Sequence, residues 1–153
     1  MIKLSISIVC YNSPFDQLQS LTDSLLVSIK YLRRRIELPI IPVFVIDNSD
    51  ETDVSCQLCS RKNHRLEELE VELHSISGHG NIGYGRAHNL SLRLIDSDYH
   101  LILNPDIIFD EDALFLALAQ MTQSERIKAL APSATDPDGN KQYLCKRYPA
   151  VLT

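Results

Sequence analysis

Short polar clusters follow strand-like apolar segments at three places in the sequence. They are Tyr11-Asn12 after residues 4–10, Asp47-Asn48 after residues 43–46, and Asn104-Pro105-Asp106 after residues 99–103. An aromatic ring can lie against a nucleobase, and a carboxylate can accept the imide N–H of uracil or thymine. A further carboxylate can bind a divalent cation that bridges a diphosphate. These roles suit Tyr11, Asp47 and Asp106 in that order, and together they predict a site for a nucleotide diphosphate.

A glycine-rich loop over residues 77–85 is the next candidate for ligand contact. It holds four of the five glycines of the chain and precedes a segment with apolar residues at helical spacing. Gly80, Gly83 and Gly85 carry no side chain, so the backbone there can approach a ligand closely. Arg86 follows directly and is suited to bind phosphate or sugar oxygens.

Each of these residues also has a purely structural interpretation. Tyr11 can be a surface aromatic residue, Asp47 can cap a helix, and Gly83 can shape a turn. His79 and His88 flank the glycine-rich loop, but histidines near loops are often only solvated polar residues. The order and placement of the clusters together, more than any single residue, indicate a site.

Strand-like and helix-like segments alternate in the order that would bring these clusters together. Strands are expected at residues 4–10, 43–46, 70–76 and 99–103 and near 127–131, and helices at about 14–35, 50–63, 87–95 and from 110 onward, with a turn at 136–139. This alternation predicts an α/β fold, an open and mostly parallel sheet with helices on both faces. Ligands of such sheets bind beyond the carboxyl ends of the strands, so we expect one cleft there.

The composition predicts a single soluble domain over residues 1–153. The chain is 44% hydrophobic and 23% charged, and no apolar run approaches the length needed to span a bilayer, so a cytoplasmic location is expected. The net charge of −5 argues against a nucleic-acid partner. The basic stretch at residues 30–35 suits a solvated helix end, and a patch for anionic lipid, hence peripheral association with the inner membrane face, stays open.

Two familiar phosphate-binding motifs are missing, and one cysteine motif is present. No G-x-G-x-x-G follows the first strand and no Walker pattern occurs, which disfavours dinucleotide oxidoreductases and P-loop NTPases. Cys56 and Cys59 form a lone C-x-x-C. A zinc site or a redox pair is conceivable there, but reduced cysteines on an ordinary helix are the favoured interpretation.

Four segments resemble the ordered signatures of family-two glycosyltransferases, which are inverting enzymes of the GT-A fold. They are Ser-Ile-Val-Cys-Tyr-Asn-Ser at 7–13, Val-Ile-Asp-Asn-Ser at 45–49, Gly-Asn-Ile-Gly-Tyr-Gly-Arg-Ala-His-Asn at 80–89 and Leu-Ile-Leu-Asn-Pro-Asp-Ile at 101–107. The resemblance covers roughly residues 4–108, and residues 132–149 also fit. Within the family the chain is most similar to rhamnosyltransferase-like members that act in surface-polysaccharide assembly.

The resemblance implies a UDP- or dTDP-linked sugar donor, held at its base and ribose by Tyr11, Asn12 and Asp47. It also implies that Asn104-Pro105-Asp106 replaces the D-x-D motif, with Asp106 holding Mg²⁺ or Mn²⁺ against the diphosphate. Asn104 in place of the first aspartate lowers the local negative charge. The residues expected to bind the donor are Tyr11, Asn12, Asp47, Asn48, Gly83, Arg86 and Asn104.

The expected activity is transfer of a hexose or deoxyhexose such as rhamnose to a polysaccharide or lipid-linked acceptor. Inverting transfer needs a general base, and in this family that base lies downstream of the donor site, so we expect it beyond Thr153. The acceptor-binding half is therefore expected outside this sequence. Without that half the sheet is left open, which predicts self-association. The alternatives are a catalytically silent nucleotide-sugar-binding module and a small α/β assembly protein.

Overall fold

The structure is a computed structural model and describes residues 1–50, 54–61, 64–136 and 138–142. The chain divides into two compact units, residues 1–115 and residues 116–153. The first unit contains the sheet and every residue predicted to bind a ligand.

A four-stranded sheet forms the centre of the first unit. Its strands are β1 (Leu4–Cys10), β2 (Ile41–Asp47), β3 (Val71–Ile76) and β4 (Tyr99–Leu103), in the order β3-β2-β1-β4. All three pairings are parallel, and Ile8 of β1 lies beside Val45 of β2 and Leu103 of β4. The four strands end at one common edge. The predicted open, parallel α/β sheet is confirmed.

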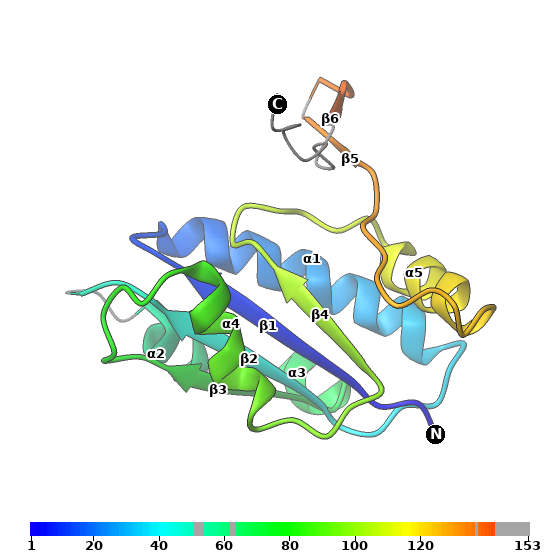
Figure 1. Cartoon of the computed structure of the whole chain (residues 1–153), viewed down its shortest axis with the longest axis horizontal. Helices are drawn as coiled ribbons and strands as arrows, with labels where there is room; N and C mark the ends of the chain where they lie inside the picture. Colours follow the sequence, from blue (N-terminus) through cyan, green and yellow to red (C-terminus); the bar gives the residue numbers. More distant parts are fainter. Residues whose placement is uncertain (51–53, 62–63, 137, 143–153) are drawn as a thin grey trace, which may run out of the picture. The chain divides into compact units, whose positions relative to one another are not determined.

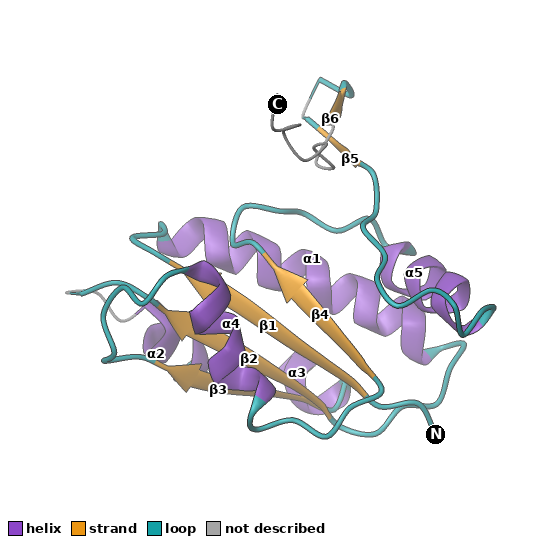
Figure 2. Cartoon of the chain, in the orientation of Figure 1, coloured by secondary structure: helices purple, strands orange, loops and turns teal. Residues whose placement is uncertain are grey.

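Helices cover both faces of this sheet (Figure 1). Helix α1 (Phe15–Arg33) lies on one face together with the short helices α2 (Val54–Cys59) and α3 (His64–Glu68), while α4 (Tyr84–Leu92) lies on the other. Figure 2 shows at least one helix between each pair of consecutive strands of this sheet, the alternation that makes parallel pairing possible. Within the described part of the chain, no helix has the length and apolar character required to cross a membrane.

Helix α1 forms because apolar residues recur every three or four positions along it. Leu18, Leu21, Leu25, Ile29 and Leu32 are buried along one stripe of the helix. The strand β1 supplies Leu4, Ile6 and Ile8 at alternate positions, all of them buried. This side of the sheet is therefore the main hydrophobic core of the unit.

The α4 side has a smaller apolar cluster near the carboxyl edge. Val9, Phe44, Ile46 and Ala87 are buried there, with Ile76, Ile82, Leu90 and Ile95 packed against them. The Phe44 ring also stacks on the ring of His74 in β3, with centroids 5.0 Å apart. This cluster anchors α4 over β1 and β2 and so fixes the position of the glycine-rich loop that precedes it.

Two expectations about secondary structure need correction. The single helix expected at 50–63 is represented by α2, and α3 follows it, while residues 51–53 and 62–63 lie outside the described part of the chain. The strand expected near 127–131 is not formed. Residues 127–131 are partly or fully exposed and have no ladder partner among the described residues, and an apolar run without a partner strand has no reason to extend.

Helix α5 (Ala113–Thr122) begins in the first unit and continues into the second. The second unit also contains the short antiparallel strands β5 (Ala134–Thr135) and β6 (Lys141–Gln142). The Asp136 carbonyl accepts the Gly139 amide N–H at 2.9 Å, and Asp136 Oδ1 accepts the Asn140 amide N–H at 2.8 Å. The Asn140 side-chain Nδ2 donates to Asp136 Oδ2 at 3.1 Å, and the hydrogen bonds from the Asn140 backbone and side chain lower the pKa of Asp136. The turn predicted here is confirmed, with Pro137 itself outside the described residues.

Candidate functional site

A cavity of about 430 Å³ lies at the carboxyl edge of the sheet. Its size falls within the usual range for small-molecule sites. It is lined by Val9, Tyr11, Ser13, Gln17, Asn48, Asn81, Tyr84, Asn104, Pro105 and Asp106. Four residues predicted from sequence, Tyr11, Asn48, Asn104 and Asp106, thus lie around one space. Tyr11 is 52% exposed, so its ring is accessible to a ligand.

Asp47 is not part of the cavity lining, although its neighbour Asn48 is. The Asp47 side chain is fully buried at the end of β2. One carboxylate oxygen accepts the Ser49 amide N–H at 3.0 Å, and the other accepts the Val54 amide N–H at 2.9 Å. Asp47 therefore holds the turn after β2 and caps the start of α2, which is the structural alternative that the sequence left open.

Asn48 faces the cavity from the same turn. It is only 2% exposed, and its Nδ2 donates to Asn81 Oδ1 at 3.4 Å. Its Oδ1 is buried and accepts no hydrogen bond from the described residues. A buried acceptor without a partner is costly, and Asn48 lines the cavity, so a ligand N–H that reached this oxygen would relieve that cost.

Asn12, Gly83 and Arg86 are outside the cavity lining, although each lies within two residues of a lining residue in the sequence. Asn12 adopts a left-handed φ of 48°, and its amide N–H donates to Ser49 Oγ at 2.7 Å, which joins the ends of β1 and β2. Gly83 has a φ of 86°, a conformation that favours glycine, and directly precedes α4. Arg86 is exposed on the first turn of that helix.

Tyr84 and Asn104 are in direct contact on the cavity wall. The Tyr84 hydroxyl donates to Asn104 Oδ1 at 2.8 Å. Burial raises the pKa of Tyr84, and the negative charge of Asp106 raises it further. Ser13, Gln17, Asn81 and Tyr84 were not singled out from the sequence. Ser13, Asn81 and Tyr84 lie within the family-like segments 7–13 and 80–89, which is the sequence signal that could have indicated them, whereas Gln17 lies in α1 outside these segments.

The cavity contains one carboxylate, that of Asp106. In the part of the chain that the structure describes, no group of three or more His, Cys, Asp or Glu side chains is placed to hold a metal ion. Cys56 and Cys59 both lie on the short helix α2, and neither belongs to such a group. Mg²⁺ is often held by one or two carboxylates together with substrate phosphates, so a single aspartate fits a cation that arrives with a diphosphate.

A buried polar cluster lies beneath α4 (residues Ser5, Ser7, His88 and His100). Ser7 Oγ is 2.7 Å from His88 Nδ1 and 2.8 Å from His100 Nε2, and Ser5 Oγ is 2.8 Å from His100 Nδ1. Burial lowers the pKa of His88 to about 4, with a smaller contribution from His100, and burial also lowers the pKa of His100. Both rings are therefore neutral at pH 7. The Tyr84 ring stands edge-on against His88 with centroids 4.5 Å apart, which connects the cluster to the cavity wall.

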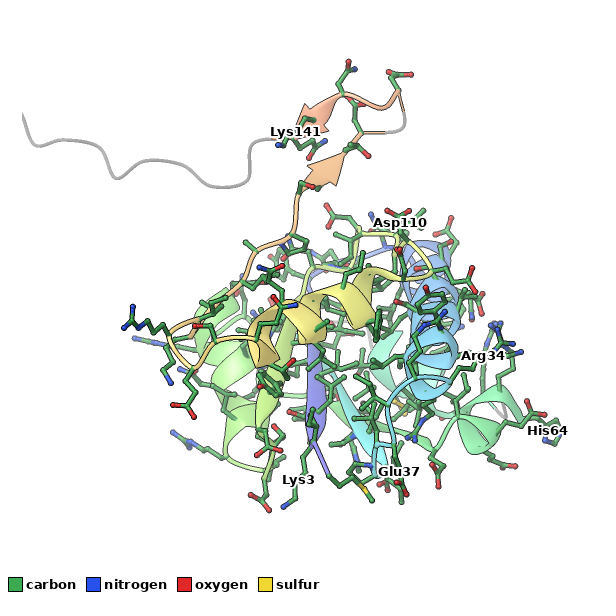
Figure 3. All side chains as sticks on the ribbon, turned by 90° about the vertical axis from the view of Figure 1, so that its right-hand side faces the viewer. Lys3, Arg34, Glu37, His64, Asp110 and Lys141 are labelled. Carbon is green, nitrogen blue, oxygen red and sulfur yellow. The ribbon has the colours of Figure 1, made fainter. Side chains whose placement is uncertain are left out.

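A larger hollow, of about 830 Å³, lies at the opposite edge of the sheet. It is lined by Met1, residues 33–40 and Glu70. Arg33 donates there to the Leu38 and Pro39 carbonyls and to Glu70 Oε2, at 2.8 to 2.9 Å, so its charge serves to hold the chain leaving α1. Lys3 and Glu37, labelled in Figure 3, precede β1 and β2 at this same end. None of the predicted site residues lies at this hollow, and the smaller cavity is the better candidate.

The chain has the α/β fold with a parallel sheet, and its cavity lies where proteins of this class bind their ligands, beyond the carboxyl ends of the strands. The sequence profile described as "Glycosyl transferase family 2" matches residues 5–147. The chain therefore belongs to glycosyl transferase family 2. This confirms the family expected from the four sequence segments.

Solved structures support the same fold. The crystal structure of residues 1–349 of TarS from S. aureus has a TM-score of 0.58 and 20% identity, covering 81% of this chain and 33% of that chain. The structure of the same TarS fragment in complex with UDP gives a TM-score of 0.56 and 19% identity, with the same coverage. At this identity the likeness shows the fold alone, and this chain spans about a third of the length of the TarS fragment. None of the curated protein sequences matches the chain.

Proposed function

We propose that the cavity at the carboxyl edge binds the nucleotide diphosphate of a sugar donor, and that the chain serves glycosyl transfer. The observation that carries the proposal is the gathering of Tyr11, Asn48, Asn104 and Asp106 around one cavity in a member of glycosyl transferase family 2. The TarS fragment, which shares the fold, was crystallised with UDP. A pyrimidine nucleotide, UDP or dTDP, is therefore the expected carrier.

Base recognition is assigned to Tyr11 and Asn48. The exposed Tyr11 ring offers a face for stacking, and the unpartnered Asn48 Oδ1 offers an acceptor for the imide N–H. Asp47 was expected to accept that N–H directly, but both its oxygens already accept backbone N–H groups. In this proposal Asp47 acts indirectly, by holding the turn that presents Asn48 to the base.

The diphosphate is assigned to Asp106 with Mg²⁺ or Mn²⁺, and to Arg86 and Asn104 as hydrogen-bond donors. A cation bound there would neutralise the charge that develops on the departing diphosphate. Asp106 is exposed at the cavity and is the one carboxylate of its lining, so it is the residue that would hold the ion. Gly83, with its positive φ, sets the direction in which Arg86 enters α4.

The finer parts of the expectation remain predictions. Rhamnose as the sugar, and a polysaccharide or lipid-linked acceptor, rest on the resemblance to rhamnosyltransferase-like members. Association with the inner membrane face and self-association are likewise predictions, the first from the basic residues 30–35 and the second from the open sheet. No residue of this chain is assigned as the general base, because the one carboxylate of the cavity lining, that of Asp106, is assigned to the cation.

Calorimetric titration with UDP, dTDP, GDP and NAD, each with and without Mn²⁺, tests the proposal. We expect binding of a pyrimidine diphosphate that strengthens with Mn²⁺, and loss of the Mn²⁺ effect in Asp106→Ala. Asp110→Ala is the matched control, because it removes an exposed carboxylate outside the cavity lining (Figure 3).

Two results would contradict the proposal. The first is absence of binding to all four ligands by folded protein, which would favour a small α/β assembly protein. The second is equal affinity for NAD and the pyrimidine diphosphates, since a site that reads the pyrimidine imide has no reason to accept both. Loss of the Mn²⁺ effect in Asp110→Ala as well would remove the specific assignment of Asp106.

A further inference from the structure

Tyr84 links two separate parts of the cavity wall. It is the first residue of α4, and its hydroxyl reaches Asn104, which follows β4 and lies 20 residues further along the chain. Its ring is held edge-on by His88, one helical turn away in α4, at a centroid distance of 4.5 Å. His88 is itself only 3% exposed and bonded to Ser7 of β1. His88 thus holds the ring of Tyr84 in place, while the Tyr84 hydroxyl contacts Asn104.

The direction of this hydrogen bond decides which end of the Asn104 amide is available. The Tyr84 hydroxyl donates, so Asn104 Oδ1 is the acceptor. An asparagine amide has one oxygen that accepts and one nitrogen that carries two donor hydrogens. With the oxygen engaged by Tyr84, the two N–H groups of Asn104 Nδ2 are left for other partners, and no described residue accepts a hydrogen bond from them.

We propose that Tyr84 is a positioning residue that orients Asn104, so that the Asn104 amide donates hydrogen bonds to diphosphate or sugar oxygens of the donor. Asn104 then binds the ligand directly and does not ligate the cation. Asp106 remains the single carboxylate for the metal. The Asn-Pro-Asp turn accordingly differs in chemistry from a pair of metal-binding aspartates, with one donor group and one acceptor group.

The chemistry of the ligand supports these separate roles for Asn104 and Asp106. Diphosphate and sugar oxygens are acceptors, and they require donors in a site where Asp106 supplies only acceptor atoms. Burial raises the pKa of Tyr84 above its usual value, so the phenol is protonated and able to donate. The inference rests on the proposed function, because it assumes that a nucleotide diphosphate occupies this cavity.

A double-mutant cycle on nucleotide binding tests it. UDP affinity in the presence of Mn²⁺ is measured for the full chain and for Tyr84→Phe, Asn104→Ala and the double variant. Tyr84→Phe keeps the ring against His88 and removes only the hydroxyl. Tyr31→Phe is the matched control, because Tyr31 packs against Phe115 and Arg35 through its ring, outside the cavity lining.

We expect Tyr84→Phe to weaken UDP binding about 3- to 10-fold, the effect of one lost hydrogen bond. Because Tyr84 acts through Asn104, the double variant should bind like Asn104→Ala alone. At saturating UDP, the midpoint of a Mn²⁺ titration should be unchanged in Tyr84→Phe and Asn104→Ala, and should move to higher Mn²⁺ in Asp106→Ala. Tyr31→Phe should match the unmodified chain throughout.

Other results would overturn the inference. Unchanged UDP affinity in Tyr84→Phe, or effects of Tyr84→Phe and Asn104→Ala that add in full, would show that Tyr84 does not act through Asn104. A shifted Mn²⁺ midpoint in Asn104→Ala would make Asn104 a metal ligand. Failure of the unmodified chain to bind UDP or dTDP at all is a separate outcome, which removes the proposed function first.

Discussion

The two faces of the four-stranded sheet bury different kinds of side chain. On the face covered by α1, leucines and isoleucines dominate, and β1 contributes Leu4, Ile6 and Ile8. On the face covered by α4, the alternate residues of the same strand include Ser5 and Ser7, which bond to histidine rings. One strand thus serves a hydrophobic core on one side and a hydrogen-bonded cluster on the other.

The α1 face therefore contributes mainly to the stability of the fold, whereas the α4 face supports the candidate site. Packing on the α1 face depends on buried apolar area, which does not change with protonation. The α4 face depends on neutral histidines, and through Tyr84 it supports the wall of the cavity. We therefore expect the α1 face to respond to changes in side-chain volume and the α4 face to respond to pH.

The largest expected effect is on the α1 face. Leu25→Ala removes a side chain that is 2% exposed, and truncations of this kind cost about 2–5 kcal/mol in the free energy of unfolding. The loss should be the same at pH 8 and pH 5.5 when measured by urea denaturation. Val27→Ala, at a more exposed position of the same helix, is the control and should change stability by less than about 1 kcal/mol. If the loss of unfolding free energy in Leu25→Ala depended on pH, the two faces would not differ in the way proposed.

The next effect is acid sensitivity of the α4 face. The pKa of His88 is about 4 in the folded chain against 6.5 as an ordinary value, so the unfolded chain binds this proton first as the pH falls. The free energy of unfolding is therefore highest above pH 6.5, where the ring is neutral in both states, and it falls between pH 6.5 and about 4. At 1.36 kcal/mol per pKa unit the loss reaches about 3 kcal/mol, and the lowered pKa of His100 adds in the same direction.

Replacing the titrating ring sharpens this test. His88→Gln keeps a hydrogen-bonding side chain that does not titrate, and it should flatten the stability profile over this pH range. His64→Gln is the control, because the His64 side chain is 89% exposed. Equal flattening in both variants, in urea denaturation from pH 7.5 to pH 4, would mean that the buried cluster is not the cause.

The smallest expected effect on the free energy of unfolding is that of Asp47→Ala. Comparison with Asn48→Ala distinguishes the roles of these two neighbouring residues. Asp47→Ala removes the acceptor of the Val54 amide N–H, and loss of a helix cap costs about 1–2 kcal/mol. Asn48→Ala removes the unpartnered acceptor instead, so it should weaken UDP binding with less effect on the unfolding free energy. Thermal unfolding and calorimetry on both variants measure the two quantities. Stronger loss of UDP affinity in Asp47→Ala, at temperatures where it is folded, would return base recognition to Asp47.

Local sequence patterns were sufficient to predict much of the first unit. The apolar segments that became β1 and β2, and the helical spacing that became α1, depend on residues close together in the chain. The rule that parallel strands end at one edge then placed Tyr11, Asn48, Asn104 and Asp106 in one region. The strand expected near 127–131 was wrong, because apolar content indicates a strand only where a partner exists to pair with it.

The sequence by itself therefore determined the family, the α/β order of the elements and the edge at which the cavity lies. Only the tertiary structure decided the state of individual polar atoms. It showed that both oxygens of Asp47 are occupied by backbone N–H groups, that Asn48 Oδ1 is not, and that Tyr84 holds Asn104 across 20 residues. Ser7 and His88 meet although 81 residues separate them. Periodicity fixes which face of an element a residue occupies, whereas hydrogen bonding depends on distances and directions between elements, and these exist only once the chain has folded.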